Sequence, residues 1–184
     1  MENCNSPSKS LEENVDLISL FISMQAGFRS VAIEIHNKTK SKSLTLPQIY
    51  CESGKLCIPP VPCLSPGEQE VCLFTKKTGT ACGSVGVISY KLGGSRIAVL
   101  FSNPFDYNIY DMTIGLLVDD QDSKTNYEQY RQMYYKEKNS CRFVKAVCGK
   151  EIPTLSLKSH GVQISANMST CRNAILKLVI EDEN

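Results

Sequence analysis

The chain has 184 residues, which is enough for one domain with a sizeable core but too few for two. Its formal net charge is +1, and this near-neutral balance argues against electrostatic capture of nucleic acid. No stretch approaches the roughly 18 to 20 apolar residues that a membrane-spanning helix needs. We therefore expect a globular protein with no nucleic-acid partner.

The first predicted element is an amphipathic helix over residues 11–26. The stretch SLEE at residues 10–13 has the form of a capping box, which starts a helix, and the glycine at position 27 is typical of the residue after its end. Apolar residues recur every three or four positions along one face: Leu11, Val15, Ile18, Phe21 and Ile22. The pattern alone favours an ordinary helix packed on a core.

After Arg29 the hydrophobic period changes from helical to two. Val31, Ile33 and Ile35 alternate with less apolar residues, which is typical of a strand with one buried face. Similar alternation occurs near residues 44–46, 71–73, 85–87, 97–101, 110–116, 162–166 and 176–180. Clusters of turn residues separate these runs, including PPVP at 59–62 and GG at 93–94.

One segment, residues 125–136, interrupts the strands with tyrosines three and four positions apart and predicts a short second helix. The predicted fold is therefore mainly β, an antiparallel β-sandwich flanked by two short α-helices. Residues 1–28 would form the N-terminal helical segment, and residues 29–184 would form the sandwich domain.

Nine cysteines, an odd number, leave at least one thiol free or paired between chains. None are spaced as CxxC, and only His36 and His160 could add ligands, so a zinc site is disfavoured. The N-terminus carries no basic stretch typical of a secretory signal. We expect mostly reduced thiols and a soluble form that is cytoplasmic or secreted without a visible signal peptide.

Motifs for catalysis are weak in this sequence. The two histidines stand outside patterns such as HExxH, and the glycine pairs do not lead into helices as phosphate-binding loops do. The acidic stretch at residues 119–122 is typical of a solvated loop. The sequence predicts no enzyme, no catalytic residue, no metal and no cofactor.

The tyrosines are more informative, because six of the eight fall between Tyr107 and Tyr135. A strand beginning near Tyr107 and the helix at 125–136 could bring several phenols onto one face. Aromatic rings bind quaternary ammonium groups by cation–π attraction, and hydroxyl groups can donate to phosphate. A phosphocholine headgroup combines both chemistries. The alternative is that these tyrosines merely line the rim of a sandwich.

Nine sequence blocks occur in one collinear order between residue 29 and about residue 180. They are VAIEIHN at 31–37, YCESG at 50–54, PP at 59–60, PG at 66–67, TACGSVGVISY at 80–90, IAVLFSNPFDYNIY at 97–110, MYY at 133–135, ANMS at 166–169 and AILKLVI at 174–180. In these blocks the chain resembles the actinoporins and their vertebrate actinoporin-like relatives. The block FSNPFDYNIY followed by MYY is the most specific part of the resemblance.

The resemblance implies a β-sandwich of the cytolysin and lectin kind that binds phosphocholine lipids, preferably sphingomyelin. It implies that residues 11–26 insert into a target cell membrane, where protomers self-associate into a cation-selective pore. By position, the headgroup pocket would consist of Ser53, Val85, Ser102, Pro104, Tyr110, Tyr130, Tyr134 and Tyr135.

Further contacts follow from the same resemblance. Arg29 and Lys77 occupy basic positions suited to phosphate or protomer contacts. Phe105, Tyr107 and Ile109 would contact the membrane in a loop where cnidarian relatives carry tryptophan, a residue this chain lacks.

Two other functions remain open at this point. One is a non-lytic, lectin-like module that binds a phospholipid headgroup or a glycan without forming pores. The other is an intracellular sensor whose thiols respond to oxidants.

Overall fold

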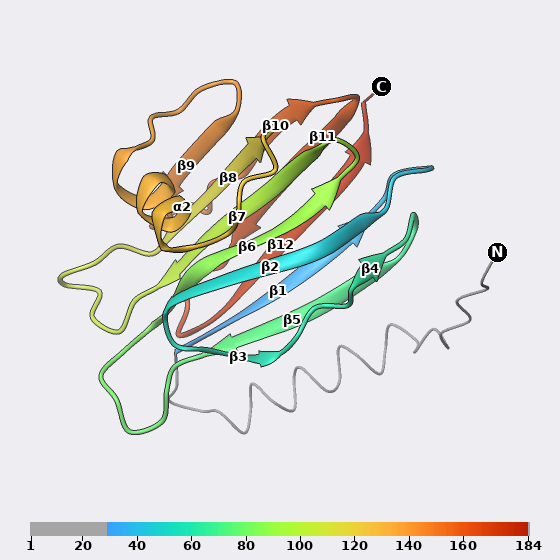
Figure 1. The fold of residues 1–184 in the computed structure, drawn as a ribbon. Coiled ribbons are helices and arrows are strands. Elements are labelled where there is room, and N and C mark those ends of the chain that lie inside the picture. Colours follow the sequence, from blue (N-terminus) through green and yellow to red (C-terminus); the bar gives the residue numbers. More distant parts are fainter. Residues whose placement is uncertain (1–28, 184) are drawn as a thin grey trace.

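The computed structural model describes residues 29–183, and within that range the strands form two packed six-stranded sheets (Figure 1). The first sheet, in the order β10-β11-β12-β1-β5-β3, contains β1 (Ser30–Asn37), β3 (Lys55–Ile58), β5 (Gln69–Thr75), β10 (Leu155–Ser159), β11 (Val162–Met168) and β12 (Asn173–Asp182). The second sheet, in the order β4-β2-β6-β7-β8-β9, contains β2 (Leu44–Ser53), β4 (Cys63–Leu64), β6 (Ser84–Leu92), β7 (Ser95–Asn103), β8 (Thr113–Asp119) and β9 (Phe143–Val147). The predicted β-sandwich is confirmed.

One pair of strands departs from the expected antiparallel arrangement. Strand β1 runs parallel to β12, in a register from Ser30 opposite Asn173 to Asn37 opposite Ile180, whereas the other ladders within residues 29–183 are antiparallel. These two strands lie far apart in the sequence, so no hairpin turn fixes their relative direction.

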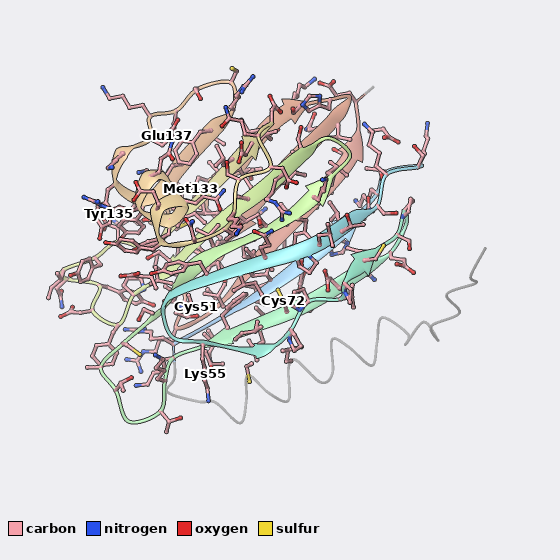
Figure 2. The ribbon with its side chains drawn as sticks, in the orientation of Figure 1. Cys51, Lys55, Cys72, Met133, Tyr135 and Glu137 are labelled. Atoms are coloured by element: carbon pink, nitrogen blue, oxygen red, sulfur yellow. The ribbon has the colours of Figure 1, made fainter. Side chains whose placement is uncertain are left out.

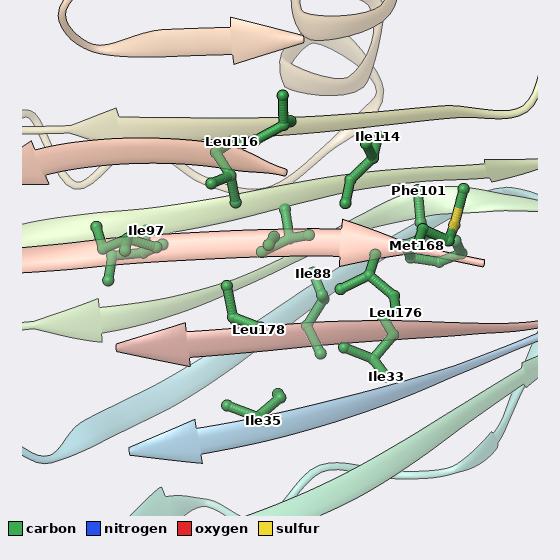
Figure 3. Close-up of a cluster of buried hydrophobic side chains, with 14 of the residues drawn as sticks. Ile33, Ile35, Ile88, Ile97, Phe101, Ile114, Leu116, Met168, Leu176 and Leu178 are labelled. Carbon is green, nitrogen blue, oxygen red and sulfur yellow. The ribbon is translucent and has the colours of Figure 1, made fainter. Parts of the chain in front are cut away.

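The core fills the space between the two sheets (Figure 3). Ile33 and Ile35 of β1 and Leu176 of β12 face residues of the second sheet that include Ile88 and Phe101. All five side chains are fully buried, as the predicted alternation requires. The Phe101 ring lies 4.5 Å from the ring of Phe74 on β5, which ties the two layers together.

The predicted helix at residues 125–136 is present as two consecutive helical segments, α2 (Tyr127–Arg131) and the π-helix η1 (Gln132–Lys136). The side chain of Asn126 caps the start of α2 by accepting a hydrogen bond from the backbone N–H of Gln129 at 3.0 Å. The helical segment covers the outer face of the second sheet, where Tyr130 and Met133 pack against a small apolar cluster (Figure 2).

One predicted strand begins later than expected, and one predicted helix falls outside the described residues. The strand predicted from residue 107 or 110 is wrong over its first part, because β8 begins only at Thr113. The backbone N–H of Tyr110 donates to the Asp106 carbonyl at 3.1 Å, and the Asp106 side chain accepts from the N–H of Asn108, so this segment turns instead of extending. The predicted helix at residues 11–26 lies outside the described residues.

The helices of residues 29–183 include none that is long and apolar enough to cross a membrane. Within the same range, no group of three or more His, Cys, Asp or Glu side chains is placed to hold a metal ion.

Candidate functional site

A row of residues crosses the outer face of the second sheet near one end of the sandwich, where β2, β7 and β9 finish and β6 and β8 begin. Ser53 on β2 lies opposite Val85 on β6, Val85 opposite Ser102 on β7, Ser102 opposite Thr113 on β8, and Thr113 opposite Val147 on β9. The row therefore brings together Ser53, Val85 and Ser102, which the resemblance had placed in one pocket. It adds the hydroxyl of Thr113 and the side chain of Val147, which the sequence analysis missed.

The hydroxyl of Ser102 has an unusual environment. Its side chain is 1% exposed, and its Oγ makes no hydrogen bond of regular geometry among the described residues. Burial raises the pKa of the Tyr134 phenol, and Ser102 lies close enough to that group to lower its pKa against this effect. Ser53, by contrast, donates from Oγ to the Gly83 carbonyl at 3.3 Å. Because an unpaired buried hydroxyl is costly, Ser102 is a candidate to bind a polar ligand atom from outside the chain.

A cluster of tyrosine rings lies beside this row, contributed mainly by the helical segment. The Tyr130 ring centroid is 5.5 Å from that of Tyr134 and 6.4 Å from that of Tyr135, and the last two are 4.8 Å apart. Tyr130 is buried and anchors the cluster, whereas Tyr135, which is labelled in Figure 2, is 65% exposed. The predicted proximity of these three phenols is present in the structure.

Two further tyrosines extend the cluster toward β2. The Tyr50 ring lies 5.8 Å from that of Tyr130 and 6.1 Å from that of Tyr127. The sequence analysis did not assign Tyr50 or Tyr127 to the site. A signal was available for Tyr127, because it shares the helical spacing of Tyr130 and Tyr134.

The phenols of Tyr50, Tyr130 and Tyr134 stay protonated at neutral pH. Burial raises the pKa of Tyr130 and Tyr134 above the ordinary value for tyrosine. Burial and the neighbouring Glu52 carboxylate raise the pKa of Tyr50 to about 12. These hydroxyl groups are therefore hydrogen-bond donors, and the rings remain neutral aromatic faces.

A pocket of about 240 Å³ opens beside Tyr134. Its lining consists of Ile109, Tyr110, Asp111, Thr113, Tyr134, Lys145 and Val147. Tyr110 and Tyr134 thus meet at one pocket, although Tyr110 comes from a loop and Tyr134 from the helical segment. Lys145 was missed by the sequence analysis. Its Nζ donates to the carbonyls of Tyr134 at 2.6 Å and Met133 at 3.2 Å, and burial lowers its pKa.

The loop at residues 104–112 projects from the same end of the sandwich as the loop at residues 76–83 (Figure 1). Phe105, Tyr107 and Ile109 are 43%, 41% and 69% exposed, so this loop presents apolar and aromatic surface to its surroundings. Pro104 is buried at its base. Gly83 lies directly against it, because a Cβ at this position would fall 2.7 Å from the Cα of Pro104.

The two basic residues singled out by the resemblance lie in different environments. The Arg29 guanidinium stacks 4.0 Å from the Tyr107 ring centroid and donates from Nη2 to the Phe105 carbonyl at 2.7 Å. Tyr107 in turn donates to Asn103 Oδ1 at 2.8 Å. Arg29 therefore holds the exposed loop, while Lys77 is exposed on the neighbouring loop.

The cysteines of the described region are all free thiols. Burial raises the pKa of Cys51 and Cys72, which makes both thiols unreactive. The pKa of Cys82 is lowered: partial burial would raise it, but the hydrogen bonds of Thr80 and the loop backbone outweigh that effect.

Comparisons with known proteins agree on one family. The model of the family described as sea anemone cytotoxic protein matches residues 17–182. DELTA-alicitoxin-Pse1b of Phyllodiscus semoni is 28% identical over 121 residues, which cover 64% of this chain and 46% of that protein. Tereporin-Ca1 of Terebra anilis is 28% identical over 167 residues, covering 84% of this chain and 86% of the relative. The chain thus spans about half the length of the alicitoxins that it matches.

Solved structures show the same fold at low sequence identity. The lipid binding protein Nakanori superposes with a TM-score of 0.68 at 15% identity, covering 92% of this chain and 79% of Nakanori. A lectin of Xerocomus chrysenteron, XCL, superposes with a TM-score of 0.51 at 13% identity, covering 83% of this chain and 97% of the lectin. These similarities establish the sandwich and carry no functional information.

Proposed function

Because this chain belongs to the sea anemone cytotoxic protein family, we propose that it is a pore-forming cytolysin that recognises phosphocholine headgroups on membranes. The observation that carries this proposal is the placement of a buried Ser102 hydroxyl, which makes no hydrogen bond of regular geometry, beside a cluster of tyrosine rings. Both lie at the end of the sandwich that bears the exposed loop at residues 104–112. A donor to phosphate, a surface for a quaternary ammonium and an apolar loop together match a zwitterionic lipid at an interface.

The chemistry of the two ends of phosphocholine suits the two parts of the site. The trimethylammonium group cannot donate hydrogen bonds, but the faces of Tyr134 and Tyr135, which pack against the buried Tyr130, can attract it by about 0.5 to 2 kcal/mol per good contact. The phosphate oxygens are strong acceptors, and Ser102 and Thr113 supply hydroxyl donors in adjacent strands. Val85 and Pro104 would provide apolar walls.

The orientation on the membrane follows from the exposed loop. Phe105, Tyr107 and Ile109 would enter the interface between headgroups and acyl chains, where amphipathic aromatic residues are stable. The segment at residues 1–28 would then insert as an amphipathic helix, with Leu11, Val15, Ile18, Phe21 and Ile22 facing the lipid. Several copies of the chain would line a cation-selective pore in the target cell membrane.

A vesicle experiment tests this proposal. The protein should bind vesicles of phosphatidylcholine and sphingomyelin and release a trapped dye, and a variant carrying Tyr110→Ala and Tyr134→Ala should lose both activities. Val61→Ala is a suitable control, because Val61 is an exposed apolar residue in the connection between β3 and β4. Unchanged binding by the double variant would contradict the assignment of the site.

The same experiment separates the pore from a non-lytic binding module. Removal of residues 1–27 should abolish dye release and leave binding intact if that segment forms the pore. If the complete chain binds vesicles but never releases the dye, the protein is instead a headgroup-binding module.

A further inference from the structure

One acidic residue, Glu52, lies next to the tyrosine cluster and is not among the residues of the proposed pocket. Glu52 precedes Ser53 near the end of β2, and its Oε2 accepts a hydrogen bond from the Tyr50 hydroxyl at 2.6 Å. Tyr50 packs against Tyr130, as described above. The carboxylate of Glu52 therefore lies at the β2 side of the same ring cluster.

The local backbone explains this position. The register of β2 against β6 shifts between Cys51, which lies opposite Gly86, and Ser53, which lies opposite Val85. Glu52 is thus the extra residue of a β-bulge, a feature that redirects side chains and often occurs next to binding sites. Its side chain bends toward Tyr50 and remains exposed to the surroundings.

No neighbouring cation within residues 29–183 neutralises the charge of Glu52. Among residues 29–183, no Lys, Arg or His forms an ion pair with Glu52. Lys136, on the helical segment, instead pairs with Glu128 at 3.6 Å. The β2 side of the ring cluster thus carries a negative charge available to a cationic ligand group.

We propose that Glu52 is the counter-charge for the ammonium end of the headgroup and a specificity-determining residue of the site. This inference rests on the proposed headgroup-binding function. The ammonium group would lie beside the rings of Tyr50 and Tyr135, which both pack against the buried Tyr130, with the Glu52 carboxylate nearby. The phosphate would point away from Glu52 and toward Ser102. Ser102 lies on β7, two strands from Glu52 on β2, and the two backbones are therefore roughly 10 Å apart across the sheet.

This arrangement selects for a positive group and against headgroups that carry only negative charge. A carboxylate attracts an ammonium ion and repels an anion without one, such as phosphatidylglycerol. The site would therefore prefer phosphatidylcholine even though both lipids offer a phosphate to the serine hydroxyl.

Two substitutions at this exposed position test the proposal by vesicle binding. We expect Glu52→Gln to bind phosphatidylcholine vesicles about threefold more weakly and Glu52→Lys about tenfold more weakly, as for a partly screened charge pair. Glu52→Lys should also gain binding to phosphatidylglycerol vesicles. The matched control is Glu183→Lys, which changes the net charge equally beyond the far end of β12 and should leave the preference unchanged.

Competition by simple ions separates the two ends of the site. Tetramethylammonium should inhibit binding of Glu52→Gln to phosphatidylcholine vesicles less effectively than binding of the wild-type chain, whereas inhibition by inorganic phosphate should be equal for both. A loss of inhibition by both ions to the same extent would show a general structural effect and would overturn the inference.

The failure of this inference can be told apart from failure of the proposed function. If the wild-type chain binds vesicles, the double tyrosine variant does not, and both Glu52 variants match the control, then only the role of Glu52 is wrong. If the wild-type chain does not bind phosphatidylcholine vesicles, the proposed function and the role of Glu52 are both wrong.

Discussion

Strand β7 joins two ends of the sandwich that differ in how their buried polar groups are satisfied. At one end Arg96, only 2% exposed, donates from Nε to Asp122 Oδ1 at 2.8 Å and from Nη1 to the Leu46 carbonyl at 3.0 Å. At the other end Ser102 is equally buried, and its hydroxyl makes no hydrogen bond of regular geometry in the described part of the chain. Both residues belong to one strand, so the contrast is local to each end.

The neighbouring groups follow the same division. At the first end Asp120 accepts from Ser95 at 2.9 Å and pairs with His160 at 2.8 Å and Arg142 at 3.0 Å. The unpartnered buried polar atoms of residues 29–183 belong to Arg29, Ser84, Ser102 and Gln129, all in the other end or in α2. A complete hydrogen-bond network stabilises a fold, whereas unsatisfied groups beside exposed aromatics indicate a surface that a ligand completes.

The largest expected effect concerns the satisfied end. Arg96→Met should lower the free energy of unfolding by about 3 kcal/mol, because it removes buried hydrogen bonds and the partner of Asp122. Urea unfolding at neutral pH measures this change. Lys91→Met is the matched control, since Lys91 pairs with the same carboxylate at 3.0 Å but is 36% exposed, and it should cost less than about 1 kcal/mol. Equal losses in both variants would contradict the importance of the buried pairing.

At the unsatisfied end a substitution should affect binding and leave stability nearly unchanged. Tyr135→Ala should weaken binding to phosphatidylcholine vesicles about fivefold, the equivalent of about 1 kcal/mol, because one face of the proposed cation site is lost. Its side chain is 65% exposed, so the folded state should lose little packing. Tyr135→Phe retains the ring and should bind normally, as a sedimentation assay would show. A loss of binding by Tyr135→Phe would mean that the hydroxyl, and not the aromatic face, makes the contact.

The predictability of the two regions from sequence also differed. Strands such as β1, with Val31, Ile33 and Ile35 on one face, could be predicted because each has one buried face and a period of two. The prediction of a strand near Tyr110 was wrong, because the exposed aromatic residues of this segment continue the alternation of β8 into a loop. The motif Asp106–x–Asn108, in which the aspartate side chain accepts from the backbone, was the available signal for a turn.

Residue spacing could predict the candidate site only where its residues lie close together in sequence, whereas the proximity of Ser53, Val85 and Ser102, on three separate strands, was expected from the family resemblance alone. Helical spacing and the family resemblance both pointed to Tyr130, Tyr134 and Tyr135. Tyr50 and Lys145 could not be found in this way, because β2 and β9 reach the helical segment through the long-range register of the sheet. Glu52 depends in addition on a bulge that alternation does not reveal.

A smaller effect tests whether the unpaired hydroxyl serves binding. Ser102→Ala should bind phosphatidylcholine vesicles about threefold more weakly, because a donor to phosphate is lost. Its free energy of unfolding should stay the same or rise by up to about 1 kcal/mol, because a buried unsatisfied group is removed. Ser84→Ala is the matched control: Ser84 is also buried and unpartnered, but it precedes Val85 on β6 and so faces the opposite side of the sheet. It should bind normally, and weaker binding there would contradict a specific role for Ser102.

The smallest expected effect is a difference in pH dependence between the two ends. Hydrogen bonds with His160 and Ser95 hold the pKa of Asp120 below 3.8, its ordinary value. A lowered pKa stabilises the folded state fully above about pH 4 and loses that contribution as the pH falls through the folded-state pKa. The stability difference between the wild-type chain and Asp120→Asn should therefore shrink below about pH 4 in urea unfolding.

Headgroup binding should stay constant between about pH 6 and pH 8, because burial raises the pKa of Tyr130 and Tyr134 and keeps both phenols protonated. Binding that titrated within that range would place an unrecognised ionisable group at the site.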